Sequence, residues 1–181
     1  MDTQRVTRLI NLMRQHTKNS AHPNMYNAIT GGAPVAALVY GLAYIGYMSG
    51  FCCKGRDGVR YEAFVETYMR ATRSGFDYTL IDVYESLRCN MLHGLIPGGS
   101  RKGKKVFTLI HGDGKNHLHG TVDAGGRVYV HVDTFCADVL AAGRDFMQAV
   151  EDAATNGNDP QLLESFWCRM ERERYSTMVS V

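Results

Sequence analysis

The sequence has little that would mark a secreted or strongly basic protein. It has no Cys-x-x-Cys pair, and its five cysteines are an odd number that cannot all pair with one another. It also lacks an apolar run at the N-terminus, where acidic and basic residues stand instead of a secretory signal. The formal net charge of +2 is too small to indicate nucleic-acid binding by itself. We therefore expect a cytoplasmic protein with reduced cysteines, in which any electrostatic site is a local cluster.

Charged residues are missing from one long stretch. No Asp, Glu, Lys or Arg occurs between Lys18 and Lys54, and residues 33–51 are apolar or small. About 20 such residues suffice to cross a membrane, but Pro34, several glycines and three tyrosines dilute the hydrophobicity of this stretch. We interpret residues 33–51 as a buried core or interface helix and expect no membrane partner. The alternative is a structural helical protein that is associated with a membrane through this segment.

No internal repeat or low-complexity linker divides the chain. A length of 181 residues suits one compact domain with a hydrophobic core and is short for two. The composition is ordinary for a globular protein, with 45% hydrophobic and 21% charged residues. We expect a single domain over residues 1–181.

The spacing of the apolar residues predicts a mainly α fold. Apolar residues recur at helical spacing over several segments, which are separated by Gly, Pro or polar residues. These segments are residues 2–17, 34–50, 61–69, 77–93 and 133–156, and a last helix that begins at Asp159-Pro160. The polar segment after the first helix, with Pro23 and the Gly31-Gly32 pair, is expected to break the helical pattern.

The period of the sequence changes between about residues 105 and 132. Three short runs, residues 106–110, 117–122 and 127–132, are rich in β-forming residues and are separated by glycine-containing turn signals. This pattern predicts a small antiparallel β-meander, inserted before the two C-terminal helices.

Arg88 lies at the edge of the apolar stripe of the predicted helix over residues 77–93. An arginine at such a place needs an anionic partner or a wet crevice. His93 follows five residues later, about 140° around an ideal helix. One straight helix does not direct both side chains at one point, so the helix end is distorted, the arginine wraps around, or a second protomer completes the site. In the simpler, structural interpretation, Arg88 pairs with an acid such as Asp82, Glu85 or Glu66, and His93 is an ordinary histidine at the C-terminal end of a helix.

The Arg-x4-His spacing, followed by Gly94, resembles the signature of HEPN domains, helical-bundle proteins that include metal-independent endoribonucleases. The surrounding residues 84–94 are similar to a bacterial HEPN-like group, and the resemblance covers about residues 34–175. Cys89 stands where HEPN nucleases usually carry a polar residue. The resemblance implies a HEPN-like helical bundle, and a homodimer in which the arginines and histidines of two protomers face a shared cleft.

The same resemblance implies that Arg88 and His93 are catalytic. A metal-independent ribonuclease needs a group that moves a proton at the ribose hydroxyl or the leaving oxygen, which suits His93. It also needs a fixed cation for the phosphate, which suits Arg88, while Asn90 is a candidate positioning group. The implied partners are RNA and an antitoxin or nucleotidyltransferase, in a toxin or phage-defence role. The alternative is a non-catalytic HEPN-like module that binds nucleotide, RNA or a protein.

A basic run follows the Arg88 segment directly. Four cations stand within five residues beside Gly98-Gly99. Such a run attracts a polyanion towards an Arg/His cleft, although a solvated loop is its commoner meaning. The candidate substrate-binding residues are therefore Arg101, Lys102, Lys104 and Lys105.

The histidines of the predicted meander form the other candidate cluster. His117 and His119 alternate along one predicted strand and so share a face, with His111 and His131 on the neighbouring strands. A zinc site needs at least three converging ligands, yet pairing across Asp113-Gly114 places His111 on the face opposite His117. We therefore expect neither a metal site nor another cofactor.

Overall fold

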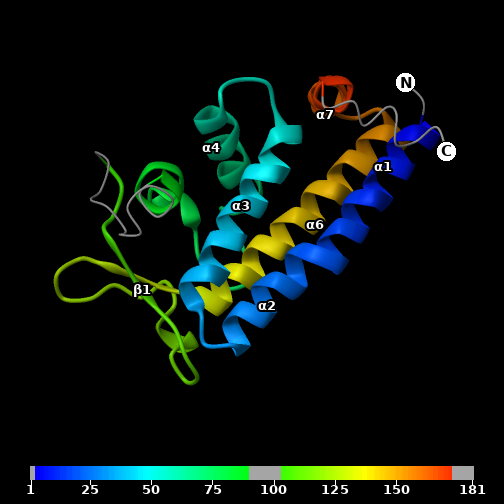
Figure 1. The fold of residues 1–181 in the computed structure, drawn as a ribbon. Helices are drawn as coiled ribbons and strands as arrows, with labels where there is room; N and C mark the ends of the chain where they lie inside the picture. Colours follow the sequence, from blue (N-terminus) through cyan, green and yellow to red (C-terminus); the bar gives the residue numbers. More distant parts are fainter. Residues whose placement is uncertain (1–2, 90–102, 173–181) are drawn as a thin grey trace.

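The computed structural model describes residues 3–89 and 103–172, the last two by their backbone alone, and it is mainly helical (Figure 1). The α-helices are α1 (Thr3–His16), α2 (His22–Thr30), α3 (Pro34–Cys52), α4 (Asp57–Tyr68), α6 (Val132–Asn156) and α7 (Pro160–Arg172). Short π or 3-10 helices are η1 (Thr17–Ala21), η2 (Tyr78–Leu80), η3 (Val83–Cys89) and η4 (Asn116–Leu118). The two strands are β1 (Phe107–Ile110) and β2 (Val128–His131). The predicted mainly α class is confirmed.

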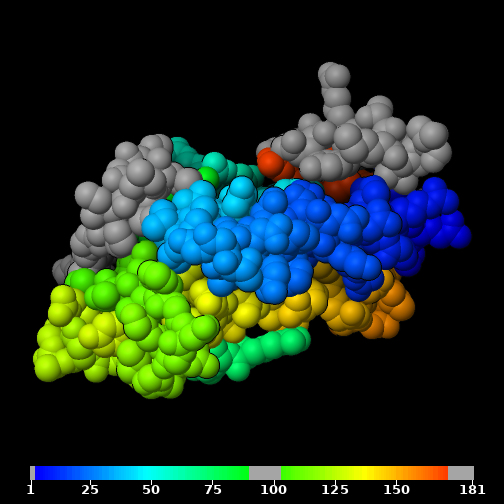
Figure 2. Space-filling view, turned by 60° about the horizontal axis from the view of Figure 1, so that its bottom comes forward, coloured from blue at the N-terminus to red at the C-terminus, as the bar shows by residue number. Residues whose placement is uncertain are grey.

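Residues 3–30 form one long rod of α1, η1 and α2 (Figure 1). The predicted apolar stripe of α1 is buried, and the helix packs against α6. The predicted break is confirmed at Gly31-Gly32, which form the turn after α2, but it is wrong at Pro23, which falls in the first turn of α2, where its missing N–H is not needed. A widened π turn over η1 joins the two helices. Figure 2 shows the blue rod lying along the yellow and orange α6, with the green β region at one end.

The predicted core helix is confirmed as α3, which packs against α2, α4, α6 and α7. Leu38, Leu42, Ile45 and Met48 have no exposed surface and follow helical spacing along it. In the described part of the chain, α3 is also the helix that is long and apolar enough to cross a membrane, although 56% of this stretch is buried inside the fold. Its apolar character is therefore accounted for by packing against four neighbours.

The crossing of α3 and α6 is close because glycine occupies it. A Cβ atom at Gly143 of α6 would lie 2.5 Å from the Tyr44 hydroxyl of α3, and one at Gly41 would lie 3.0 Å from the Phe135 ring. The Tyr44 hydroxyl is 2.8 Å from the Thr17 hydroxyl, which ties η1 to the same crossing. Larger side chains at these glycines would push apart the two helices that meet at the centre of the core.

The predicted helix over residues 77–93 is wrong for the part of it that the structure describes. The chain instead forms the 3-10 turn η2 and then, after Ile81 and Asp82, the π helix η3. Asp77 caps η2 through its side chain, and the Leu80 carbonyl accepts the N–H of Lys105 at 2.8 Å rather than a helical N–H. This hydrogen bond to a distant residue ends η2. As a result, the side chains of η3 point in other directions than they would on an α-helix that began at residue 77.

The predicted antiparallel meander is also wrong, because β1 and β2 are parallel neighbours. Phe107 lies opposite Val128, and Ile110 lies opposite His131. The chain between them passes through η4, which replaces the strand predicted over residues 117–122, and the turn at residues 123–126 leaves one antiparallel bridge beside β2. The glycine turn signals are present as turns, but turn residues do not determine which strands become neighbours.

Both predicted C-terminal helices are confirmed. α6 ends at Gly157, whose φ of +67° is the left-handed conformation that favours glycine, and its N–H donates to the Ala153 carbonyl at 2.8 Å. α7 follows Asp159, whose carboxylate accepts the Leu162 N–H at 2.9 Å as an N-terminal cap. These helices share one hydrophobic cluster with α1, α3, α4 and the strands.

Candidate ligand site beside Arg88

The Arg88 side chain lies against two aromatic rings. Its guanidinium carbon, at the last turn of η3, is 5.2 Å from the ring centre of Tyr84 and 5.6 Å from that of Tyr61. Tyr61 comes from α4 and Tyr84 from η3, so this contact joins two separate segments of the chain. A guanidinium over an aromatic face is held by electrostatic attraction to the ring. The position of Arg88 is therefore fixed by aromatic side chains.

The two tyrosines differ in exposure. Tyr61 is buried and its hydroxyl donates to the Leu42 carbonyl at 3.2 Å. Burial raises the pKa of Tyr61 well above its ordinary value, although the charge of Arg88 acts in the opposite direction. Tyr84 is half-buried, and its ring centre is 5.3 Å from that of Tyr61. A Cβ atom at Gly58 would lie only 2.9 Å from the Tyr84 ring. Arg88 thus has one rigid buried ring and one accessible ring beside it.

Within the described ranges, Arg88 makes no ion pair. The structural interpretation is wrong on this point, because none of the proposed acids is among the ion-pair partners that the structure places beside a cation. The half-buried guanidinium carries N–H donors in a planar fork that fits a carboxylate or a phosphate. Arg88 therefore retains donors for an anionic ligand.

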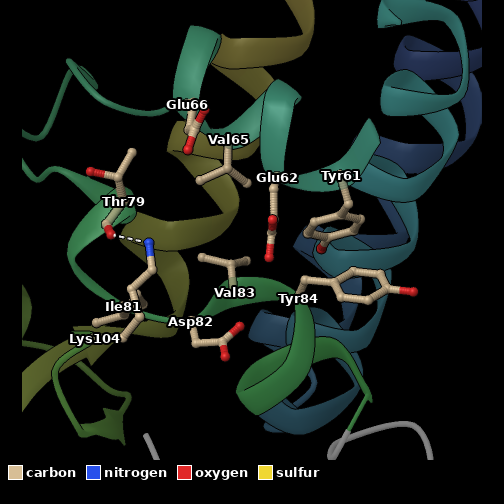
Figure 3. A pocket seen from close by; sticks show the side chains of 10 residues that line it. All are labelled: Tyr61, Glu62, Val65, Glu66, Thr79, Ile81, Asp82, Val83, Tyr84 and Lys104. Atoms are coloured by element: carbon tan, nitrogen blue, oxygen red, sulfur yellow. Dashed lines mark hydrogen bonds between the residues drawn. The ribbon is translucent and has the colours of Figure 1, made fainter. Parts of the chain in front are cut away.

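A cavity of about 300 Å³ adjoins the same two tyrosines (Figure 3). Figure 3 shows side chains of α4 reaching into it from one side and residues of the segment 79–84 facing them from the other. The lining residues are Tyr61, Glu62, Val65, Glu66, Thr79, Ile81, Asp82, Val83, Tyr84 and Lys104. The cavity and the Arg88 contact, which we call together the Arg88 site, are built from the same pair of segments.

Asp82 is the most deeply buried acid of this cavity, with 4% of its surface exposed. One carboxylate oxygen accepts the Glu85 N–H at 2.8 Å and so caps the first turn of η3. The other oxygen, Oδ2, is buried and has no hydrogen-bond partner among the residues that the structure describes. A buried acceptor without a donor costs about 1–3 kcal/mol. A ligand that donated a hydrogen bond to Oδ2 would recover that free energy.

The remaining charges make the cavity rich in acceptors. Glu62, Glu66 and Asp82 are acidic, and Lys104 is the cation among the lining residues. The Lys104 ammonium donates to the Thr79 carbonyl at 2.7 Å, which holds it at the edge (Figure 3). Such a cavity favours a ligand with N–H donors, whereas the neighbouring guanidinium favours an anion. A nucleotide combines the two, with donors on its base and negative charge on its phosphate.

The structure describes only part of the predicted site. Lys104 lines this cavity, and Arg88 lies over two of its lining tyrosines, whereas the Lys105 side chain is exposed and its backbone N–H pairs with η2. The other predicted catalytic or substrate-binding residues, Asn90, His93, Arg101 and Lys102, lie outside the described residues.

The histidines of the β region do not share a strand face as predicted, because His117 lies within η4 and His119 follows it. His119 instead meets the start of α6, where its Nδ1 accepts the N–H of His131 at 3.0 Å. The His131 ring is itself 3.0 Å from the Thr134 hydroxyl and 3.2 Å from the Gly112 carbonyl. Across the described stretches of the chain, no group of three His, Cys, Asp or Glu side chains is arranged to hold a metal ion.

His119 belongs to a second polar group, which we call the Asp138 cluster. The Tyr78 hydroxyl donates to Asp138 Oδ2 at 3.1 Å and is 3.1 Å from His119 Nε2. Asp138 also accepts hydrogen bonds from the N–H and the hydroxyl of Ser74. Because His119 Nδ1 accepts the His131 N–H, its proton is on Nε2 and is donated to Tyr78. Burial is the main cause that lowers the pKa of His119, and the charge of Asp138 opposes it.

Sequence reasoning missed Tyr61, Asp82 and Tyr84 as parts of the Arg88 site. Asp82 was considered only as an ion-pair partner of Arg88, and the structure gives it a capping role and a place in the cavity wall. The sequence held one signal for these rings. Gly58 precedes Tyr61 by three residues on a helix, and because it has no side chain it leaves space for a ring beside Tyr61. Which ring fills that space is decided only when the segment 79–84 packs on α4.

The chain was also compared with known proteins. None of the protein-family models, curated proteins or solved structures in the comparison matches it.

Proposed function

We propose that this chain is a HEPN-like, metal-independent endoribonuclease in which Arg88 and His93 act on the scissile phosphodiester. The observation that carries the proposal is the state of Arg88, which is half-buried, held by two tyrosine rings and without an ion-pair partner in the described part of the chain. A buried arginine is normally paired with an anion. An arginine that is fixed but unpaired is therefore a fitting place for a substrate phosphate.

In this proposal the Arg88 site binds one nucleotide of single-stranded RNA. The guanidinium receives the phosphate, and the half-buried Tyr84 ring offers a surface on which a base stacks. The neighbouring cavity accepts hydrogen bonds from the amino groups of a base through its carboxylates, Asp82 among them. Proteins usually read RNA bases in unpaired regions, where the base is free to leave its stack.

His93 supplies the proton transfer in this scheme. It moves a proton at the ribose 2'-hydroxyl or at the leaving 5'-oxygen, while Arg88 stabilises the charge that develops on the phosphate. The 2'-oxygen attacks the phosphorus as the bond to the 5'-oxygen breaks, so the products carry a 2',3'-cyclic phosphate and a 5'-hydroxyl. We propose that a homodimer places the arginine of one protomer near the histidine of its partner.

The test incubates purified protein with mixed single-stranded RNA in EDTA and analyses the chemistry of the new ends. We expect cyclic-phosphate ends from the wild type and a loss of rate of roughly 100-fold or more in Arg88→Ala and in His93→Ala. His117→Ala is the matched control, because His117 is exposed and lies outside the site, and it should cleave like the wild type. Cleavage that survives both substitutions, or that requires added metal, would contradict the proposal.

Arg88→Lys separates charge from geometry. Lysine keeps the positive charge but not the planar fork, so we expect cleavage between that of the wild type and that of Arg88→Ala. If the wild type binds RNA in an Arg88-dependent way but leaves it intact, the chain is the non-catalytic binding module instead.

A further inference from the structure

A second cavity, on the side of α4 that holds Arg60, is lined by cations and has no place in the proposed cleavage site. It has a volume of about 80 Å³ and lies where the end of α3, the start of α4 and α7 meet. Its lining residues are Gly50, Cys53, Lys54, Gly55, Arg60, Ser165, Cys168 and Arg169. Three of these are cations and none is an acid, in contrast to the acceptor-rich cavity beside Arg88.

Arg60 is the central cation of this cavity. Its side chain is 15% exposed, and its guanidinium is paired through Nη2 with Asp57, whose carboxylate is largely exposed. The Nε–H of Arg60 is buried and has no hydrogen-bond acceptor in the parts of the chain that the structure describes. The guanidinium therefore has an unused N–H donor at Nε, while its ion-pair partner Asp57 is exposed.

The rest of the wall suits a small anion. Arg169 packs over Gly50, where a Cβ atom would lie 3.4 Å from its Nε, so the absence of a side chain lets this second guanidinium approach. Ser165 adds a hydroxyl group that donates or accepts. The cavity also lies beside the start of α4, a twelve-residue helix whose first N–H groups receive no side-chain cap. The acids near the wall, Asp57 and Glu164, are both exposed and form ion pairs that salt screens.

We propose that this cavity is a phosphate-binding site, in which an oxyanion bridges the Arg60 and Arg169 guanidinium groups. Guanidinium groups hold phosphate through paired N–H donors, and a hydroxyl and uncapped helix N–H groups are the donors that accompany them in such sites. The ligand is a phosphate group, either free in solution or carried by a nucleic-acid backbone. The proposal does not depend on the cleavage chemistry of Arg88, and it stands if that chemistry fails its test.

Two cysteines in the wall allow binding to be followed without an activity assay. Cys53 and Cys168 line the cavity and are half-buried, and both have free thiols. A bound phosphate would cover them and slow their alkylation by iodoacetamide. The measurement is the alkylation rate of each cysteine, by peptide mass spectrometry, at rising inorganic phosphate and at constant ionic strength set with chloride. A second arm replaces inorganic phosphate by a short single-stranded RNA.

We expect phosphate to slow alkylation of both cysteines in the wild type, and Arg60→Gln to weaken the apparent affinity by about tenfold or more. Arg70→Gln is the matched control, since Arg70 is exposed and lies beyond the C-terminal end of α4, and it should bind as the wild type does. Ser165→Asp places a carboxylate in the wall and should abolish protection even if Arg60→Gln misfolds. Protection by RNA but not by inorganic phosphate identifies the backbone as the source.

The proposal is overturned if neither phosphate nor RNA protects the two cysteines beyond the effect of chloride. It is equally overturned if protection is the same in Arg60→Gln, Ser165→Asp and the wild type.

Discussion

The Arg88 site and the Asp138 cluster are both groups of polar side chains within a hydrophobic fold. They differ in how many of their hydrogen-bond donors and acceptors have partners. In the Asp138 cluster, Asp138 and His119 are almost fully buried, and their oxygens and nitrogens have partners in Ser74, Tyr78 and the backbone. In the Arg88 site, the guanidinium has no ion pair and Asp82 Oδ2 has no donor within the described residues.

This difference separates a structural role from a functional one. A fully bonded buried cluster fixes the packing of its surroundings, here the β region against α6. Unused donors and acceptors at a cavity lower stability, and such groups are typical of sites that bind ligands. We therefore expect substitutions in the Asp138 cluster to change stability, and substitutions in the Arg88 site to change ligand binding with little effect on stability.

The largest expected effect on stability comes from Asp138→Ala. The substitution leaves the Tyr78 hydroxyl and the Ser74 N–H without an acceptor inside the fold, so the free energy of unfolding should fall by about 3 kcal/mol. Urea unfolding followed by circular dichroism measures it. Asp138→Asn keeps one amide oxygen as an acceptor and should lose less. A loss below about 1 kcal/mol for Asp138→Ala would mean that the cluster is not structural.

A smaller effect is expected on acidification, through His119. Burial lowers the pKa of His119 below its ordinary value of 6.5, so below pH 6.5 the unfolded chain binds more protons at this residue than the folded chain. The stability contributed by neutral His119 is complete above pH 6.5 and is lost as the pH falls from 6.5 through the lower pKa of the folded state. Protonation also removes the Nδ1 acceptor of the His131 N–H.

Urea unfolding between pH 7 and pH 5 tests this sign. His119→Gln should flatten the pH dependence of the unfolding free energy, whereas His117→Gln, in an exposed position, should leave the wild-type curve unchanged. An unchanged slope in His119→Gln would show that the Asp138 cluster does not titrate through this histidine.

In the Arg88 site, Asp82→Asn should change the unfolding free energy by less than about 1 kcal/mol. Asparagine retains the oxygen that caps η3 and removes the charge on an oxygen without a partner. If the cavity binds a base through Asp82, the same substitution should weaken RNA binding, measured by fluorescence anisotropy with a labelled single strand. A large loss of stability with unchanged RNA binding would show that Asp82 stabilises the fold and does not bind the ligand.

The sequence predicted the fold where one local signal decided the outcome. The apolar stripe of α1, the uncharged run of α3 and the Asp159-Pro160 start of α7 each specify a helix through neighbours along the chain. The predictions were wrong where contacts between distant segments determine the local structure. The predicted α-helix does not continue past η2, where the Leu80 carbonyl pairs with Lys105, and β1 and β2 are parallel because the chain crosses over between them.

The candidate site shows the same limit. Arg88 and Lys104 were predicted from residue type and position, and both lie at the cavity or its tyrosines. Tyr61 was not predicted, because nothing in the sequence near Arg88 shows that α4 packs beside η3. The alternative interpretation, in which Arg88 pairs with Glu66, Asp82 or Glu85, fails among the described residues, where the guanidinium lies against two tyrosine rings instead.

The central claim is that Arg88 serves a ligand and not the fold. The most direct measurement takes one preparation of Arg88→Ala and determines both its unfolding free energy in urea and its rate of RNA cleavage in EDTA. We predict a stability loss of no more than about 1 kcal/mol, the size of a partly exposed contact between a cation and an aromatic ring, together with a loss of cleavage of about 100-fold or more. A loss of several kcal/mol with cleavage unchanged in the fraction that remains folded would contradict the claim.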